Sequence, residues 1–496
     1  MAQKAMRISW LAGVFAIIAS FALACACATS AFAASGSLKV VTEEGNHSYQ
    51  AYKLFACDVN ADGSISNVST DGCMPASFYE DAFASSRPQE MAEEVSRQIN
   101  GPQASAYAAA LSRTVVAHSE GAVAREFQTG VEIALDSGVY LLISHDAQPI
   151  LVTIGGDAVV VNEKSTLPSV TKEVASVSKG SSQVDSASFD SLATTGVSKQ
   201  MAFRATGTLP SNYEAFDTYS YAFIDTPSEG IVIDPSSVLV YRVDAQGQRV
   251  SISEGYTVSC EQGVLRVAFE DLKRSVPAAA HGDKIVLEYR AELDVERAQL
   301  GYGQGNANSV VLEYRRSPSF NETATTKPGV AKAFAFALNL IKVDASDPQK
   351  TLSGACFELK DEQGAVVASG TTDGSGFLSL AGLAPGTYRL EETAAPAGYK
   401  VPTSPIKVEI GADVQTLFLS ASVSSGLAKV VSVDADGGLI SLSIANEQAT
   451  VGATVQTGDR AAGTLAGLAV VALGSGLVVV LALLARRKHR RNQAQR

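Results

Sequence analysis

The stretch from 168 to 449 is a succession of short β-forming segments separated by turn residues. The segments Lys284 to Leu293 and Ser309 to Tyr314 are typical, and Gly, Pro, Asp and Ser stand between such segments. Strands at this spacing indicate β-sandwiches. We therefore expect one sandwich over residues 168–330 and a second, smaller one over residues 331–449.

The preceding residues, 34–167, have a mixed pattern. Ala, Glu and Gln are frequent between 78 and 116, which predicts helix, and β-forming segments lie before and after this stretch. The expected fold class is therefore mainly β, with tandem Ig-like β-sandwiches behind a mixed α/β N-terminal domain. The strands expected in the N-terminal domain are 38–41, 49–57, 138–144 and 158–161.

The N-terminus has the pattern of an export signal. Lys4 and Arg7 precede an apolar run over 10–28, and Ala31-Phe32-Ala33 supplies the small residues that signal peptidase accepts. We expect residues 1–33 to be a signal peptide that is cleaved after Ala33. An uncleaved membrane anchor and a lipoprotein are the alternatives.

The C-terminus has the pattern of a membrane span. Residues 461–485 carry no charge, and as a helix they would be about 37 Å long, enough to cross a bilayer. A basic tail begins at Arg486, and such cations hold a tail on the cytoplasmic side. The bulk of the protein is therefore expected outside the cell. A permanent type I membrane anchor is one interpretation of this end, and a span that is removed by cleavage is the other.

Composition argues against several function classes. Lys and Arg number 39 against 51 Asp and Glu, a net charge of −12, whereas nucleic-acid binding depends on clustered cations. The His residues are scattered, and the segment Asp58 to Gly63 is not followed by the Glu that a calcium loop needs. We expect no nucleic-acid partner, no metal, no cofactor and no enzyme acting on external substrates.

The cysteines do not form a disulfide framework. Cys57, Cys73, Cys260 and Cys356 follow the expected signal peptide and are widely spread. Disulfides could persist in an exported chain, and Cys57 with Cys73 is the one close pair. The sequence leaves open whether these two cysteines bond.

Three polar residues of the last segment occupy positions that point into the predicted sandwich. Lys342 shares its strand face with two leucines, and Glu392 shares its face with a tyrosine and a leucine. Asn446 closes the strand expected over 439–444. The pattern thus predicts an amine, a carboxyl group and a carboxamide in or beside one core.

These three groups have the chemistry to form a covalent cross-link. A buried lysine tends to lose its proton, and a neutral amine is a nucleophile. A buried Glu is pushed toward its protonated form, so it can hydrogen-bond the Asn carboxamide and relay protons as ammonia leaves. The expected product is an isopeptide bond between Lys342 and Asn446, with Glu392 as catalytic acid, formed in one self-directed turnover.

The last segment resembles the Cna-B-type domain of Gram-positive pilins. The resemblance is carried by Lys342-Val343-Asp344, by the segments Leu352 to Leu359 and Gly386 to Tyr399, and by Asn446. In that family a lysine, the Glu of a Glu-Thr pair and a terminal Asn form the bond. By position, the resemblance implies these roles for Lys342, Glu392 and Asn446.

The segment 168–330 resembles the middle isopeptide-forming domain of fimbrial shaft subunits. The segments Ile224 to Gly230 and Tyr289 to Leu293 carry this resemblance. It implies Lys172 as the amine, Asp225 as the acid and Asn308 as the electrophile, with Asn306 as the second choice. Arginines 315 and 316 stand where the family often has asparagines, which leaves open whether this bond forms.

The remaining segments resemble the ends of the same subunits. Residues 34–167 resemble the N-terminal pilin domain, and Lys164 occupies the place of the lysine that attacks the next subunit. Residues 450–496 resemble a sortase sorting signal, which implies cleavage between Thr457 and Gly458. Thr454 and Val455 replace the usual Leu-Pro of that signal.

The resemblance implies a structural function. We expect a subunit of a cell-surface pilus, or fimbria, polymerised and anchored to the cell wall of a Gram-positive bacterium by sortase, and supporting adhesion. The implied partners are sortase, neighbouring pilin subunits, peptidoglycan and host surface ligands. The alternative is a monomeric wall- or membrane-anchored adhesin, or an ancillary tip or base pilin, with the same domains.

Overall fold

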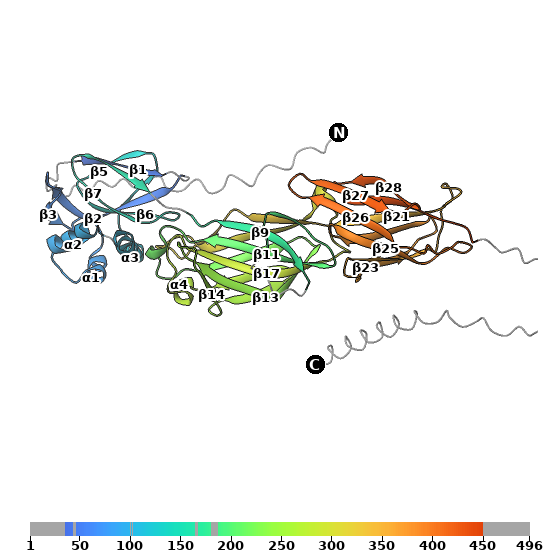
Figure 1. The fold of residues 1–496 in the computed structure, drawn as a ribbon. Helices are drawn as coiled ribbons and strands as arrows, with labels where there is room; N and C mark the ends of the chain where they lie inside the picture. The colour runs from blue at the N-terminus through green and yellow to red at the C-terminus, as the bar shows by residue number, and fades with distance from the viewer. Residues whose placement is uncertain are drawn as a thin grey trace, which may run out of the picture. The chain divides into compact units, whose positions relative to one another are not determined.

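The computed structural model of the chain describes residues 35–42, 46–99, 101, 103–163, 167–179 and 187–449. These residues are mainly β, with sandwiches behind a part that contains the longer helices, which confirms the predicted fold class (Figure 1). The expected signal peptide, the apolar span and the candidate residues Lys164, Thr457 and Gly458 lie outside the described residues. Among the described helices, none combines the length and apolarity needed to cross a bilayer.

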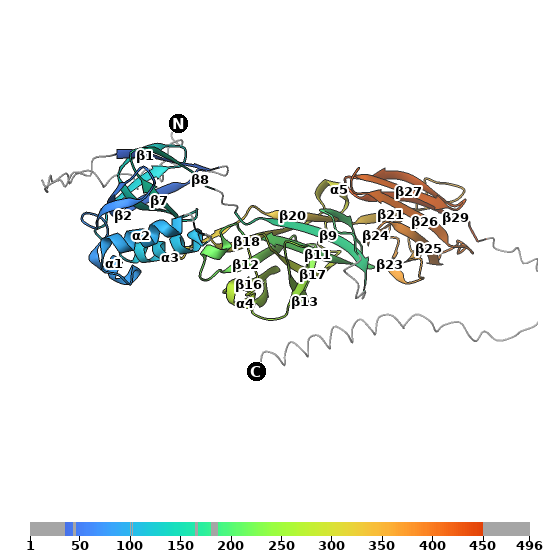
Figure 2. The same ribbon diagram turned by 60° about the vertical axis from the view of Figure 1, so that its left-hand side comes forward.

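The N-terminal portion, residues 35–163, is built around a sheet that is covered on both faces. This sheet has the order β3-β2-β6-β7, with β4 also paired to β2. Three helices pack on one face (Figure 2), and the small sheet β5-β1-β8 packs on the other. Strand β6 is buried along its whole length because its alternate side chains enter two different cores. The elements are β1 (Ser35–Thr42), β2 (Ser48–Val59), β3 (Ile65–Ser69), α1 (Ala76–Ala82), α2 (Pro88–Ile99), α3 (Ala104–Ala117), β4 (Ala124–Gln128), β5 (Glu132–Asp136), β6 (Gly138–Ser144), β7 (Ile150–Ile154) and β8 (Ala158–Glu163).

The middle portion, residues 167–334, packs two sheets around an aromatic core. One sheet has the order β14-β13-β17-β11-β9, and the other has the order β10-β20-β18-β12-β16-β15 with β19 paired to β18. Phe203, Tyr221, Phe223 and Tyr289 are among the buried side chains between them. The elements are β9 (Val170–Ser178), β10 (Leu192–Thr194), β11 (Lys199–Thr208), the 3-10 helix η1 (Tyr213–Ala215), β12 (Tyr221–Pro227), β13 (Ile231–Val243), β14 (Arg249–Ile252), β15 (Thr257–Glu261), β16 (Val264–Phe269), α4 (Leu272–Ser275), β17 (Lys284–Leu293), α5 (Gly301–Gln304), β18 (Asn306–Arg315), β19 (Thr323–Thr325) and β20 (Gly329–Phe334).

The C-terminal portion, residues 336–449, is a second sandwich with the sheet orders β24-β21-β29-β28 and β23-β22-β25-β26-β27. The chain enters it at Ala335, between β20 and β21. Its first and last strands, β21 and β29, are parallel neighbours, with Lys342 opposite Ile444. The elements are β21 (Phe336–Asp344), β22 (Cys356–Lys360), β23 (Val366–Thr371), β24 (Phe377–Leu383), β25 (Gly386–Ala394), β26 (Ile406–Asp413), β27 (Phe418–Ser424), β28 (Ala428–Asp434) and β29 (Leu439–Asn446).

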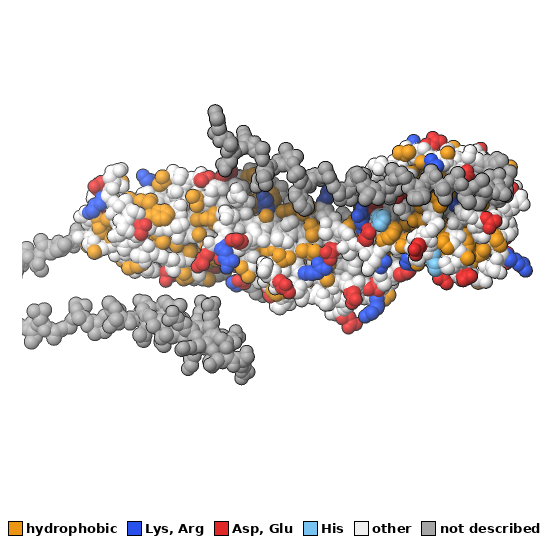
Figure 3. Space-filling model, turned by 180° about the vertical axis from the view of Figure 1, so that it is seen from behind, with side chains coloured by type: hydrophobic (Ala, Val, Ile, Leu, Met, Phe, Trp, Pro, Cys, Tyr) orange, Lys and Arg blue, Asp and Glu red, His pale blue; other side chains and the backbone are white. Residues whose placement is uncertain are grey.

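The outer surface carries charges of both signs. Acidic and basic side chains are interspersed over the face that Figure 3 shows. Several are paired, such as Arg266 with Glu313 at 2.7 Å and Lys179 with Glu292 at 3.0 Å. Half-exposed pairs of this kind contribute at most about 1 kcal/mol each, so the fold depends mainly on its buried cores.

Candidate functional site

Lys342 lies in the interior of the C-terminal portion. It is on β21 and its side chain is fully buried. Leu338 and Leu340 are buried on the same face of the strand, as expected for alternate residues. Because β21 is an inner strand between β24 and β29, its inward side chains lie between the two sheets and away from solvent.

Glu392 reaches the same interior from the opposite sheet. Tyr388 and Leu390 are buried on β25, and the Glu392 side chain is only 2% exposed. The adjacent Glu391 pairs instead with Lys360 and is 34% exposed. Only one carboxylate of this Glu-Glu pair is therefore internal.

Asn446, the last residue of β29, completes the cluster. Lys342 Nζ donates a hydrogen bond to Asn446 Oδ1, and Asn446 Nδ2 donates to Glu392 Oε1 at 2.6 Å. Lys342 Nζ also lies 2.9 Å from Glu392 Oε2, as an ion pair. The amine, the carboxamide and the acid thus contact one another pairwise, and all three side chains are buried.

The surroundings favour a reactive amine. Burial lowers the pKa of Lys342 below its ordinary value of 10.5, and the neighbouring charge of Glu392 only partly opposes this shift. A lower pKa increases the neutral, nucleophilic fraction of the amine. Since Nζ already contacts the carboxamide oxygen, the adjacent carbon is close by. The arrangement can join Lys342 to Asn446 with loss of ammonia.

Asp344 fixes the chain around Asn446. Parallel pairing places Asp344 opposite Asn446. Its carboxylate accepts hydrogen bonds from Ser346, from Gln448 Nε2 at 2.9 Å and from Tyr399 Oη at 2.7 Å. These bonds, those of Ser346 foremost, hold the pKa of Asp344 well below its usual range. The ionised carboxylate therefore ties the end of β29 to the end of β21.

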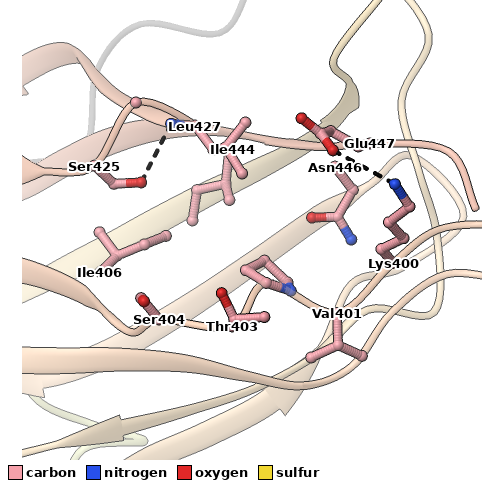
Figure 4. Close-up of a pocket in the computed structure, with 12 residues that line it drawn as sticks. Lys400, Val401, Thr403, Ser404, Ile406, Ser425, Leu427, Ile444, Asn446 and Glu447 are labelled. Carbon is pink, nitrogen blue, oxygen red and sulfur yellow. Dashed lines mark hydrogen bonds and ion pairs between the residues drawn. The ribbon is translucent and has the colours of Figure 1, made fainter.

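A pocket of about 370 Å³ lies beside this cluster (Figure 4). Its lining comes from the residues around the start of β26, the turn before β28 and the end of β29, and includes Asn446. Lys400 and Glu447, which also line it, form an exposed ion pair at 3.8 Å. The pocket thus provides open space next to Asn446, which is itself fully buried.

The middle portion brings its own amine, acid and carboxamide together. Lys172 on β9, Asp225 on β12 and Asn308 on β18 are all buried. Lys172 Nζ pairs with Asp225 Oδ2. Burial lowers the pKa of Lys172, against the opposing effect of Asp225. The cluster therefore has the same three groups as the C-terminal portion.

Tyr289 on β17 is a fourth member that the sequence did not single out. Its Oη donates to Asp225 Oδ1 at 2.8 Å and accepts from Lys172 Nζ at 2.7 Å and from Asn308 Nδ2 at 2.6 Å. Its place opposite Phe203 in the β11–β17 ladder puts it in the core. Alternation in β17 predicts that Tyr289 is buried, but not what its hydroxyl contacts.

The second-choice electrophile, Asn306, is placed differently. Its carboxamide accepts a hydrogen bond from Gln299 N at 2.9 Å and donates to Gln299 O and Ala333 O. It therefore holds the loop before β18, and Asn308 is the residue beside the amine. Arg316, at the end of this strand, pairs with Asp146 at 3.0 Å.

The described cysteines are free thiols, including Cys57 and Cys73. Cys57 is buried on β2, and burial raises the pKa of its thiol to about 11. Cys73 is half-buried. No group of three His, Cys, Asp or Glu side chains in the described part of the chain is placed to hold a metal ion.

Sequence comparisons relate parts of the chain to known proteins. Residues 336–422 match the family model of SpaA, a prealbumin-like fold domain. A curated relative, the trypsin-resistant surface T6 protein of Streptococcus pyogenes serotype M6, is 23% identical over 280 residues, which cover 53% of this chain and 49% of the relative. The chain thus spans about half the length of the curated relative that it matches.

A solved structure with the same fold is that of a backbone pilin. The T6 backbone pilin of serotype M6 Streptococcus pyogenes, a modular three-domain protein, matches with a TM-score of 0.57 at 15% identity, over 84% of this chain and 99% of that one. The full-length major pilin SpaD of Corynebacterium diphtheriae has a TM-score of 0.47 at 16% identity, over 84% and 98% of the two chains. The fold of the present chain is that of the T6 backbone pilin.

Proposed function

We propose that this chain, which is similar in sequence and fold to backbone pilins of Gram-positive bacteria, is a structural subunit of a cell-surface pilus. Its proposed domains are 34–167, 168–330 and 331–449. An isopeptide bond between Lys342 and Asn446 would stabilise the last of them, and a bond between Lys172 and Asn308 the middle one. The subunit performs no reaction beyond these single turnovers.

The buried contact of Lys342, Glu392 and Asn446 is the observation that carries the proposal. A lysine without a chemical role would be expected at the surface, where water solvates its charge. Here the amine is fully buried and in contact with a carboxamide and an acid. These are the groups that an amide exchange needs, in a domain of the prealbumin-like type.

The proposed step is balanced without a cofactor. Lys342 gives up one proton to the Glu392 carboxylate, and its neutral Nζ attacks Asn446 Cγ. The new Cγ–Nζ bond forms, the Cγ–Nδ2 bond breaks, and the protons relayed by Glu392 leave with Nδ2 as ammonia. The pocket beside Asn446 supports this proposal because it offers the ammonia an exit.

The position of the bond suits a subunit under tension. Lys342 and Asn446 lie on the first and last strands of the C-terminal portion. A pull on the two ends of that portion would load a covalent amide, whereas each hydrogen bond of a β-ladder contributes only about 1 kcal/mol net. A covalently closed domain could not be unravelled end to end.

Assembly would depend on residues outside the described part of the chain. After export directed by residues 1–33, sortase would cleave between Thr457 and Gly458 and join Thr457 to Lys164 of a neighbouring subunit. The last transfer would anchor the fibre to peptidoglycan. Contact with host surface ligands would follow from exposure on the cell surface.

Two measurements test the proposal. The intact mass of the wild-type protein should be lower by about 17 Da for each bond, the mass of ammonia. Lys342→Ala should abolish the loss assigned to the C-terminal portion, whereas Lys360→Ala, on a surface lysine, should keep it. An unchanged wild-type mass would refute the cross-links.

Polymerisation needs its own test in cells that carry the matching sortase. Cell-wall extracts boiled in detergent should contain a ladder of covalent multimers. A single wall-bound band in place of the ladder would contradict the shaft-subunit proposal. It would favour a monomeric adhesin with the same domains.

A further inference from the structure

The two buried clusters differ in how the acid reaches the carboxamide. In the C-terminal portion, Glu392 uses one carboxylate oxygen for the Lys342 amine and the other for Asn446 Nδ2. In the middle portion, Asp225 uses Oδ2 for the Lys172 amine, but its Oδ1 accepts from Tyr289. The hydroxyl of Tyr289, in turn, accepts from Asn308 Nδ2.

Side-chain length explains this difference. An aspartate is one methylene shorter than a glutamate, so its carboxylate extends less far from its strand. Tyr289 comes from the opposite sheet, on β17, and its hydroxyl fills the interval between Asp225 on β12 and the Asn308 amide on β18. The pair of Asp225 and Tyr289 thus spans what Glu392 spans alone in the C-terminal portion.

The bonding capacity of the hydroxyl is fully used. A phenolic group has one hydrogen to donate and two lone pairs. Tyr289 donates to Asp225 and accepts from Lys172 and Asn308, at distances between 2.6 and 2.8 Å. The amine nitrogen and the amide nitrogen therefore lie on either side of a single oxygen atom, within two hydrogen-bond lengths of each other.

The ring of Tyr289 has a separate contact with the amine. Lys172 Nζ lies 4.7 Å from the centre of the Tyr289 ring and 5.0 Å from the centre of the Phe203 ring. Both rings can stabilise a cation through their faces. Burial keeps the pKa of Tyr289 well above 10, so the group remains a neutral hydroxyl. The ring and the hydroxyl can therefore be tested separately.

We infer that Tyr289 is a positioning residue for the proposed bond between Lys172 and Asn308. Its hydroxyl supplies the hydrogen-bonded link between acid and carboxamide that Glu392 makes directly in the C-terminal portion. This inference rests on the proposed function, because it concerns the same amide exchange. It adds a fourth residue to the middle cluster and gives it a role that the Lys, Asp and Asn do not perform.

The step in the middle portion balances in the same way. Neutral Lys172 Nζ attacks Asn308 Cγ, the Cγ–Nδ2 bond breaks, and ammonia leaves. One proton must pass from Nζ to Nδ2, and Tyr289 Oη contacts both nitrogens. Asn308 Oδ1 has no hydrogen-bond partner among the described residues. The hydroxyl accepts from the nitrogen of the carboxamide and not from its oxygen, because its single hydrogen is already donated to Asp225.

Tyr289→Phe is the test, because it removes one oxygen and keeps the ring. The stacking on Phe203, at 5.6 Å between ring centres, and the contact of the ring with the amine should persist. We expect formation of the Lys172–Asn308 bond to be slower by on the order of 100-fold, the lower end of what one positioned group contributes to a proton transfer. The Lys342–Asn446 bond in the same chain should form at the wild-type rate and serves as an internal reference.

The rate can be followed by mass. Newly synthesised full chain is sampled at intervals and digested, and the branched peptide joining Lys172 to Asn308 is quantified against its unjoined parts. Tyr221→Phe is the matched control, since Tyr221 is also buried in this core but its hydroxyl has no partner among the described residues. That control should leave the rate unchanged.

A double variant separates positioning from packing. In Tyr289→Phe with Asp225→Glu, the longer acid should reach Asn308 directly, as Glu392 reaches Asn446, and should restore bond formation. A packing defect would not be repaired by lengthening an acid on another strand. If circular dichroism shows that the double variant is folded and the bond still does not form, the role assigned to Tyr289 is overturned.

The remaining outcomes distinguish this inference from the proposed function. If wild-type protein forms the bond and Tyr289→Phe forms it equally fast, the inference is overturned and the proposed bond stands. If wild-type protein never forms the branched peptide, the proposed bond in the middle portion is refuted, and the role of Tyr289 with it.

Discussion

Replacing Glu392 by Gln removes the acid of the C-terminal cluster with almost no change in shape. Gln keeps the length of the side chain and its hydrogen bond to Asn446, but it cannot take a proton from Lys342. We expect the bond between Lys342 and Asn446 not to form in this variant. The variant keeps the ammonia of about 17 Da, and Gln is about 1 Da lighter than Glu, so its intact mass should exceed that of the wild type by about 16 Da.

The missing bond should also lower stability by an amount that the structure sets. Lys342 and Asn446 are 104 positions apart. By analogy with a disulfide, a cross-link over such a loop removes about 4 to 5 kcal/mol of chain entropy from the unfolded state. At about 4 °C per kcal/mol for a domain of this size, the C-terminal portion of Glu392→Gln should melt roughly 15 to 20 °C lower.

The assay combines mass spectrometry with calorimetry of the full chain. Hydrogen exchange of peptides from β21 and β29 assigns the shifted transition to the C-terminal portion. Glu391→Gln is the matched control, because Glu391 is the adjacent carboxylate but pairs with Lys360 at the surface. A half-exposed pair contributes at most about 1 kcal/mol, so this control should keep the mass loss and shift the transition by only a few degrees.

Two results would refute this reasoning. If Glu392→Gln loses ammonia as the wild type does, the acid is not required for the bond. If the bond is absent but the melting temperature is unchanged, the cross-link does not stabilise the portion through the entropy of the unfolded chain. Either result can be read without reference to the other portions, because each variant carries a single change.

Three further predictions follow from other residues. Gly376→Ala should slow formation of the Lys342–Asn446 bond and destabilise the C-terminal portion by about 1 to 3 kcal/mol, because Gly376 has a φ of +77° and an added Cβ would lie 2.8 Å from Lys342 O. Gly374 has open space around it, so Gly374→Ala should be neutral in the same mass and melting assays. The hydrogen bond that buried His47 donates to Glu163 raises the pKa of His47 above 6.5, so the stability that this pair contributes is present below pH 6.5 and is lost as the pH rises through the higher native value. Urea denaturation from acid to alkaline pH should show this loss in the wild type and not in His47→Gln. Lys164→Ala should abolish the detergent-resistant ladder, whereas Lys179→Ala, which changes an exposed lysine paired with Glu292, should keep it; a ladder that survives Lys164→Ala would point to another acceptor lysine.

Strands with strong alternation could be predicted from the sequence. The strand at 284–293 and the apolar strand at 138–144 were predicted with the bounds that the structure has. The helix-like stretch 78–116 proved to be three helices, α1, α2 and α3, separated by short breaks. Pro88 begins α2, as its fixed backbone angle favours, and the sequence pattern alone did not resolve these breaks.

Other strands escaped prediction although they pair in the sheets. All five residues of β15 are exposed and β28 is mostly exposed, so neither strand adds a long buried face to a core. These are edge strands, held by one neighbour each. Their pairing is a tertiary property that a local pattern does not encode.

In the candidate site, too, the sequence predicts which side chains are buried but not which side chains they contact. Alternation on a single strand places Lys342 and Glu392 inside, because each lies on a strand with buried neighbours. The contact between them depends on how two sheets face each other, which alternation along a single strand does not encode. The hydroxyl of Tyr289 was missed for the same reason, since its three partners come from three other strands.

The proposed bond between Lys342 and Asn446 can form only when β21 and β29 pair in the correct register, so it selects for that register. A slip of one residue along this ladder would turn Asn446 to the opposite side of its strand and carry its carboxamide away from the amine. Only a correctly aligned molecule could then complete the reaction, and having done so it could not revert. Because ammonia is released, the bond would permanently distinguish subunits that reached the correct register before they join a fibre.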